Sequence, residues 1–155
     1  MSSSLGYLPG QIKETCNNMQ IDSNDQVIYN SPAGFNQLDT IAMANAPATM
    51  TAQQVLNGLV TVDGDGGPED LSLPTAALLV GAMNCPTVNT SIRLVVRNVG
   101  GEIVTVIAST GTVIAVSGSA AIATVNTIEL LIVLTNVTPG SEAATAYVIA
   151  KDNIH

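Results

Sequence analysis

The sequence predicts an all-β protein: an antiparallel β-sandwich of the jelly-roll type, with one or two short helices and an extended N-terminal arm. From Ser91 onwards, segments rich in β-branched residues alternate with glycine-containing turns, and a turn about every ten residues is typical of sandwiches and barrels. Hydrophobic residues make up 46% of the 155 residues but aromatic residues only 3%, so Val, Ile, Leu and Ala must fill the core. A chain of this length corresponds to one ordinary domain.

The first 50 residues differ in composition from the rest, so we expect an arm over residues 1–50 and a β-sandwich domain over residues 51–155. The arm is rich in Ser, Asn, Gln, Met and Ala and shows little periodicity. Its Val27, Ile28 and Tyr29 are expected to form a strand and to contact a partner. An extended arm loses conformational entropy when it becomes ordered, so it needs a partner or a neighbouring subunit to lie along. A mobile tail is the alternative.

Two short helices are predicted from local signals. The sequence Thr51-Ala-Gln-Gln54 fits a capping box, in which the Thr hydroxyl and the Gln amide satisfy backbone N–H groups reciprocally. Gly58 suits the left-handed residue that ends a helix. A second helix is predicted over Ala76–Met83, and three of its apolar residues are expected to share one face: Leu78, Leu79 and Ala82.

The segment Ile92–Arg97 alternates with the period of a strand, because its apolar residues at 92, 94 and 96 share one face and its arginines share the other. Gly100-Gly101 follows and can take the positive φ angles of a two-residue hairpin, leading into a strand over Ile103–Ile107. The sequence therefore predicts that these two strands pair side by side.

The longest apolar run, Ile128–Leu134, is apolar on both faces apart from Glu129. Such a segment is expected to be a central strand, or a strand whose second face meets another subunit. Leu131 and Val133 are therefore the candidate subunit-interface residues. Pro139-Gly140 then fits a type II turn before a last strand over Ala144–Ala150.

The charge balance excludes several partner classes. Four basic residues stand against twelve acidic ones, for a net charge of −8, and the basic residues do not cluster. Nucleic acid and anionic membranes are thus not expected as partners. Only 10% of the residues are charged, which is low for a monomer that keeps its whole surface in water, so we expect a homo-oligomer.

No group of residues predicts an enzyme or a cofactor site. The single histidine, His155, is the last residue, where no second group can hold it as a catalytic base. The carboxylates between Asp63 and Asp70 do not have the spacing of an EF-hand, so a solvated turn is expected and a weak divalent-cation site is the alternative. Cys16 and Cys85 lie outside any metal-ligand spacing and are expected to be free thiols, with a disulfide as the alternative. The N-terminus has no basic or apolar segment typical of a secretory signal, and none is expected.

The stretch from Thr51 to Ile149 resembles a module of virion structural proteins from double-stranded DNA viruses. The resemblance rests on turn-and-strand patterns over about two-thirds of the chain. The matching elements are Thr51–Gly58, Leu73–Leu78, Leu94–Asn98 before the glycine pair, Gly111, Gly118, Thr135–Thr138, Gly140–Ala143 and Tyr147.

The resemblance implies a non-enzymatic β-sandwich head, commonly trimeric, that decorates or cements a capsid or belongs to its minor proteins. Its partners would be further copies of itself and the major capsid protein, and its location would be the capsid surface after synthesis in the host cytoplasm. The short arm argues against a long fibre. A receptor- or glycan-binding head of a tail or capsid fibre is the alternative, using loops at one end of the sandwich.

Overall fold

The computed structural model describes residues 19–21, 27–29, 39–44, 46–109, 111–115 and 120–152. The chain divides into two compact units, Met1–Phe35 and Asn36–His155. In the first unit, β1 (Met19–Ile21) pairs antiparallel with β2 (Val27–Tyr29). The predicted strand at Val27, Ile28 and Tyr29 is therefore present.

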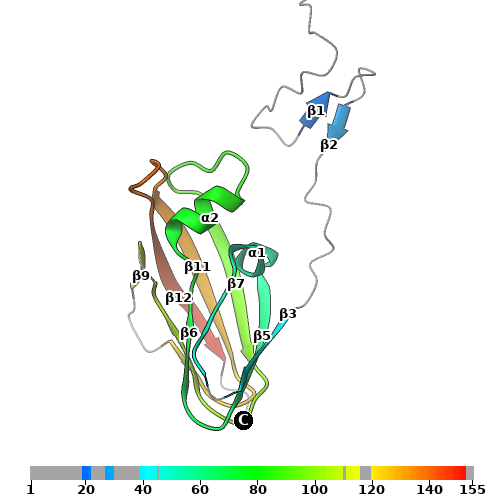
Figure 1. Ribbon diagram of the computed structural model, residues 1–155, viewed down its shortest axis with the longest axis vertical. Coiled ribbons are helices and arrows are strands. Elements are labelled where there is room, and N and C mark those ends of the chain that lie inside the picture. Colours follow the sequence, from blue (N-terminus) through cyan, green and yellow to red (C-terminus); the bar gives the residue numbers. More distant parts are fainter. Residues whose placement is uncertain are drawn as a thin grey trace, which may run out of the picture. The chain divides into compact units, whose positions relative to one another are not determined.

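The second unit contains two sheets and two short helices (Figure 1). The six-stranded sheet has the order β3 (Asp39–Ala44), β5 (Leu59–Asp65), β7 (Ser91–Asn98), β11 (Thr127–Asn136), β12 (Ala143–Asp152) and β9 (Thr112–Ala115). The four-stranded sheet has the order β10 (Ala121–Ile122), β8 (Val104–Ile107), β6 (Glu69–Ser72) and β4 (Ala48–Thr49). The prediction of an all-β protein is confirmed.

Both sheets are mixed, so the prediction of purely antiparallel sheets is wrong. The pairs β3–β5, β5–β7 and β12–β9 are parallel in the large sheet, and β4–β6 and β6–β8 are parallel in the small one. After β5 the chain crosses to the small sheet as β6 and returns through a helix as β7, which restores the direction of β5. Alternation within single segments does not reveal such crossovers.

The predicted hairpin at Gly100-Gly101 is also wrong. β7 and β8, which flank the two glycines, belong to different sheets, and neither glycine has a positive φ angle. Among the described strands of the second unit, the only consecutive strands that pair are β11 and β12. Their connection contains the predicted type II turn: Gly140 has φ 82°, and Ser141 N donates to Thr138 O at 2.9 Å.

The boundary of the second unit lies earlier in the chain than residue 50. β3 pairs with β5 and β4 pairs with β6, so both strands extend sheets formed by the later sequence. Met43 and Met50 are each 1% exposed and belong to the hydrophobic core. Residues 39–50, which by composition resemble the arm, are therefore part of the β-rich unit.

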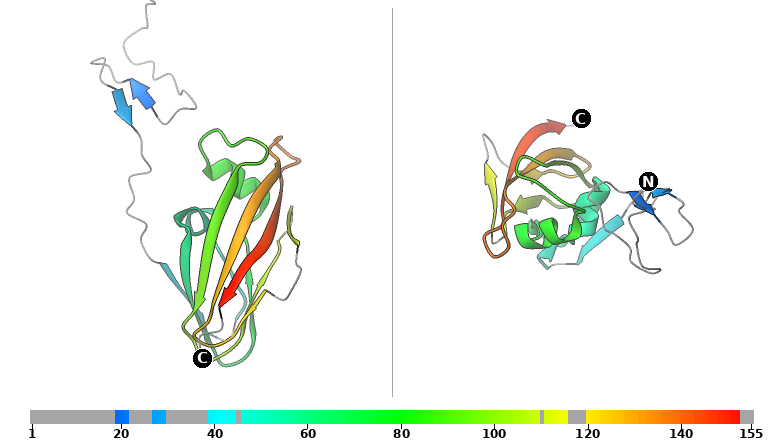
Figure 2. Two further views of the ribbon diagram at one scale, coloured as in Figure 1. Left: turned by 180° about the vertical axis from the view of Figure 1, so that it is seen from behind. Right: turned by 90° about the horizontal axis from the view of Figure 1, so that it is seen from above.

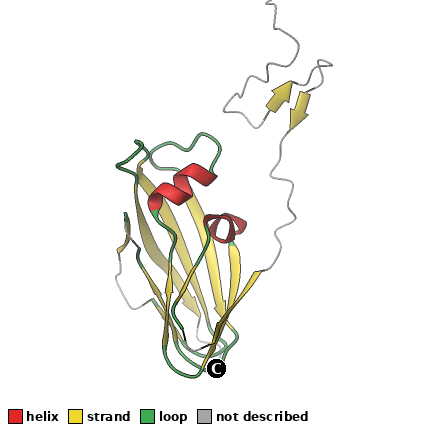
Figure 3. Ribbon diagram, in the orientation of Figure 1, coloured by secondary structure: helices red, strands yellow, loops and turns green. Residues whose placement is uncertain are grey.

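Both helices have N-terminal caps, and the cap of the first is the predicted capping box. In α1 (Ala52–Asn57), Gln54 N donates to the Thr51 hydroxyl at 3.2 Å and Thr51 N donates to Gln54 Oε1 at 2.8 Å, while Gly58 ends the helix with φ 80°. In α2 (Ala76–Ala82), the Thr75 hydroxyl accepts a hydrogen bond from Leu78 N at 3.2 Å. Figure 3 shows both helices toward the same end of the unit.

The apolar face predicted for the second helix is only partly buried. Ala76 and Leu79 are buried, whereas Leu78 is 59% exposed and Ala82 is exposed. Every residue of α2 is apolar or glycine, so α2 has no polar face from which its orientation could be predicted.

One buried cluster joins the large sheet, the small sheet and both helices. Its members include Leu94, Ile128, Leu130 and Ile132 from the large sheet, Leu71, Val104 and Ile122 from the small sheet, and Val55 and Leu79 from the helices. The core is aliphatic, as the composition predicts.

Candidate functional site

The candidate assembly surface is the face of the large sheet that points away from the core, which we call the outer face. Figure 2 (left) shows β7, β11 and β12 side by side on this face, with no other described element in front of them. On β11 the even-numbered residues 128–134 are buried, whereas Leu131 and Val133 are half-buried on the outer face. The prediction of a central strand is confirmed, since β11 lies between β7 and β12.

Leu131 stands at the middle of the outer face. Its register partners are Arg93 on β7 and Tyr147 on β12. Tyr147 is 43% exposed. Directly opposite residues share a face in neighbouring strands, so a row of one cation, one aliphatic side chain and one aromatic ring crosses the sheet.

An ion pair lies within this surface. Arg93 Nε pairs with Glu129 Oε1, and the arginine side chain is 71% exposed whereas the glutamate side chain is 15% exposed. Val95 is the register partner of Glu129. An ion pair this open to water contributes at most about 1 kcal/mol to the free energy of folding, so its main effect is to place charge beside the apolar residues Leu131 and Val133.

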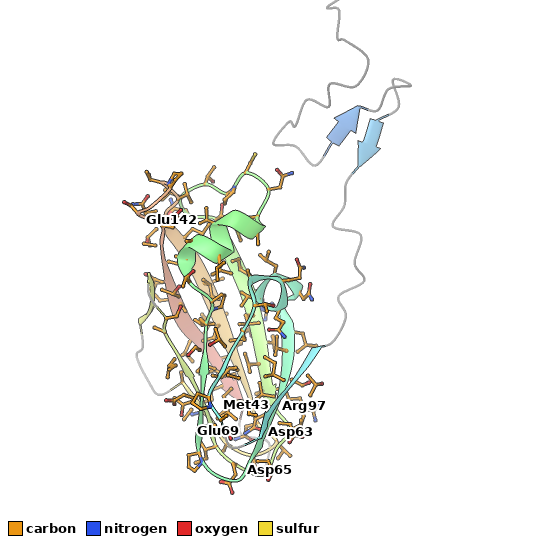
Figure 4. The ribbon with its side chains drawn as sticks, in the orientation of Figure 1. Met43, Asp63, Asp65, Glu69, Arg97 and Glu142 are labelled. Carbon is orange, nitrogen blue, oxygen red and sulfur yellow. The ribbon has the colours of Figure 1, made fainter. Side chains whose placement is uncertain are left out.

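The acidic segment between residues 63 and 70 forms no metal site among the described residues. No three carboxylate, histidine or cysteine side chains there are placed to hold an ion. Asp63 and Asp65 are exposed on β5 and Asp70 is exposed on β6, whereas Glu69 is buried on the side of β6 that continues with Leu71. Figure 4 labels Asp63, Asp65 and Glu69 near one end of the unit. The fold thus separates carboxylates that lie close together in the sequence.

Glu69 is the polar group that the sequence did not single out. It is 7% exposed, and neither carboxylate oxygen has a hydrogen-bond partner. It stands beside Val104, and its side of β6 continues with buried Leu71. A buried carboxylate without a hydrogen-bond partner loses its hydration and gains nothing in return, so Glu69 lowers the free energy of unfolding. The alternation of Glu69 with Leu71 and Leu73 could have predicted that Glu69 lies on the buried side of a strand.

A second buried polar residue, Asn98, organises the end of the unit opposite the helices, which we call the loop end (residues 66–68, 99–103 and 123–126). Asn98 is fully buried. Its Nδ2 donates to Glu102 O at 2.6 Å and to Ile122 O at 3.1 Å, and its Oδ1 accepts from Gly100 N at 3.0 Å. The Asn98 side chain thereby joins the connection after β7 to the end of β10. Asn98 continues the buried series 92, 94 and 96 on β7, so its buried position was predictable from the sequence. Its hydrogen bonds to Glu102 and Ile122 were not predictable.

The same end contains a close backbone contact and a strained residue. A Cβ atom on Gly100 would lie 2.2 Å from Gly64 O, so only glycine fits there. Val125 has φ 57°, a left-handed conformation that β-branched residues rarely adopt. Three aliphatic side chains are exposed on these loops: Val99, Ile103 and Val125.

The two cysteines were predicted to be free thiols, and several other predicted residues lie outside the described part of the chain. Cys85 is disulfide-bonded, so the prediction that it is a free thiol is wrong; spacing along the sequence excludes a metal motif but does not report pairing. Cys16, Gly118 and His155 lie outside the described residues, as do the side chains of Val27, Ile28 and Tyr29.

Comparison with family models, with curated proteins and with solved structures finds no match for this chain. Within the described residues, no helix is long and apolar enough to cross a membrane. The functional argument therefore rests on the surfaces described above.

Proposed function

We propose that this chain is a non-enzymatic structural protein of a virus particle, built as a jelly-roll-like β-sandwich that decorates or cements a capsid. In this proposal it assembles as a homotrimer, its N-terminal arm anchors it to the major capsid protein, and it resides on the capsid surface after synthesis in the host cytoplasm. No cofactor, nucleic acid or membrane takes part.

The outer face is the observation that carries the proposal. Leu131 and Val133 on β11, with Tyr147 on β12, give a largely apolar strip on a surface that no described element covers. Aromatic and aliphatic residues with an arginine nearby are the composition of protein interfaces. Self-assembly uses such a strip, and a structural role needs no reactive side chain.

Light scattering of the purified protein measures the self-assembly. We expect the mass of three chains at micromolar concentration. Leu131→Lys should lower that mass, because a charge would be buried between subunits without a partner. Ile103→Lys, at an exposed residue of the loop end away from the outer face, is the matched control and should leave the mass unchanged. A monomeric wild-type protein would refute the assembly.

The arm is tested by removing the first compact unit, residues 1–35. A deletion reaching residue 45 would also remove β3 and the buried Met43, so it would damage the core as well as the arm. We expect the 1–35 deletion to keep the thermal unfolding of the β-rich unit and to lose incorporation into particles. Full incorporation of the truncated protein would exclude anchoring by the arm.

The loop end favours one alternative, a receptor- or glycan-binding head. Exposed Val99, Ile103 and Val125 on loops fixed by Asn98 form a preorganised surface, and strain such as that at Val125 is common at binding sites. Host-cell binding by the isolated protein, lost in Val99→Ser with Ile103→Ser and kept in Leu131→Lys, would establish this function in place of capsid decoration.

A further inference from the structure

The helix α2 presents an apolar face to water, which is unusual for a surface helix. Leu78 is 59% exposed, and Ala77, Gly81 and Ala82 are exposed beside it. A helix that is apolar all round is normally covered on all sides, since surface helices carry polar residues on their outward face. Space is open above it as well, because a Cβ atom built on Gly81 would meet nothing within 4 Å.

The absence of charge extends well beyond the helix. No Asp, Glu, Lys or Arg occurs between Leu71 and Ile92, a segment that includes α2 and the following loop, residues 83–90. That loop carries a further exposed aliphatic residue, Val88, at 49% exposure. We call α2 and residues 83–90 the charge-free end. Depletion of charge together with exposed aliphatic side chains distinguishes the centre of a protein interface from ordinary surface.

The distribution of charge indicates which molecule covers this end. The chain carries a net charge of −8, so copies of it repel one another. Figure 4 shows Asp63, Asp65 and Glu69 toward the opposite end of the unit, and the outer face carries Arg93 and Glu129. Glu142 is the charged residue labelled toward the same end as α2, and its carboxylate accepts a hydrogen bond from Gly140 N at 3.0 Å within its own turn. Contact through the charge-free end brings copies together while their acidic loop ends remain far apart.

We propose that the charge-free end is a contact between copies of this chain, with the α2 helices converging on the symmetry axis of the oligomer. Residues near such an axis meet their own counterparts, so an uncharged surface is matched by another uncharged surface. Leu78 and Val88 are then buried at the centre of the contact. This inference rests on the proposed self-assembly and adds a second contact to the one proposed at Leu131 and Val133.

The test compares Leu78→Lys and Val88→Lys with Ile103→Lys, a lysine introduced at an exposed aliphatic residue of the loop end. All three positions are exposed, so the variants should fold, which circular dichroism checks. Light scattering and sedimentation measure the association. Both are run with and without a reductant, so that the disulfide at Cys85 does not determine the result. We expect Leu78→Lys and Val88→Lys each to weaken association at least about tenfold. Ile103→Lys should associate like the wild type.

The outcomes separate this inference from the proposed function. If Leu78→Lys and Val88→Lys associate like the wild type while Leu131→Lys dissociates, the charge-free end is not a contact and self-assembly through the outer face stands. If the wild-type protein is monomeric at micromolar concentration, the self-assembly itself is refuted and the inference with it. If only the two charge-free-end variants dissociate, the contact is assigned to α2.

Discussion

Gly100 and Gly101 are adjacent in the sequence but should respond in opposite ways to alanine. A Cβ atom on Gly100 would lie 2.2 Å from Gly64 O and 2.3 Å from Gly64 N, whereas a Cβ atom on Gly101 would meet nothing within 4 Å. Neither residue has a positive φ angle, so conformational strain does not distinguish them. The predicted difference comes entirely from the contact with Gly64.

The expected loss in Gly100→Ala follows from what would have to move. The atoms it would strike belong to the backbone of β5 and cannot rotate away as a side chain can, and β5 is paired on both sides with β3 and β7. Overpacking against movable groups costs about 1–3 kcal/mol, so we expect a decrease of about 3 kcal/mol or more in the free energy of unfolding. That corresponds to a melting temperature lower by roughly 10 °C. Gly101→Ala should be neutral or stabilising by up to about 1 kcal/mol, because it restricts the unfolded chain.

Guanidinium unfolding followed by circular dichroism measures both variants against the wild type, and an unchanged slope with denaturant shows that the comparison is valid. Equal, large losses in the two variants would favour the two-residue hairpin, in which both glycines need positive φ angles. A Gly100→Ala variant as stable as the wild type would refute the close approach of the two backbones.

Three further substitutions test other features of the fold by the same unfolding measurement. Glu69→Met should raise the free energy of unfolding by about 1–3 kcal/mol, since it removes a buried carboxylate that has no hydrogen-bond partner. The control Asp70→Met, at an exposed position, should change the free energy of unfolding little. A destabilised Glu69→Met would mean that the carboxylate makes a stabilising contact. Asn98→Leu should lower it by about 3–5 kcal/mol, because three backbone groups lose their buried partner; a loss below about 1 kcal/mol would contradict the network. Thr51→Ala should lower it by about 1 kcal/mol through loss of the capping box, and no change would show that the box does not stabilise α1.

Features set by neighbouring residues were predictable from the sequence. The capping box at Thr51, the left-handed Gly58 and the turn at Gly140 each depend on a few residues, and each is present with the expected geometry. The alternation of β7 and the central position of β11 were likewise visible, because burial of one or both faces determines which side chains are apolar.

Features set by distant residues were not predictable. Parallel pairing of β5 with β7 requires a crossover through the other sheet, which nothing within either strand specifies. Gly100 looked like a turn residue, but its need for glycine comes from Gly64, far away in the sequence. Glu69 looked like part of a solvated acidic turn, and only the start of β6 places it on the buried side. Residues 39–50 have the composition of an arm, yet β3 and β4 acquire their structure from sheets that the later sequence builds.

The two surfaces proposed for assembly differ in what covering them would cost. Closing a partner over the outer face removes water from Arg93, which is 71% exposed, and the desolvation of an ion pair offsets much of the attraction it provides. The charge-free end carries no such group between Leu71 and Ile92, so burial there retains its full hydrophobic gain. Both surfaces also carry exposed or half-buried apolar side chains, so sulfate should strengthen a contact at either one. The charge-free end can therefore be covered at a lower electrostatic cost than the outer face.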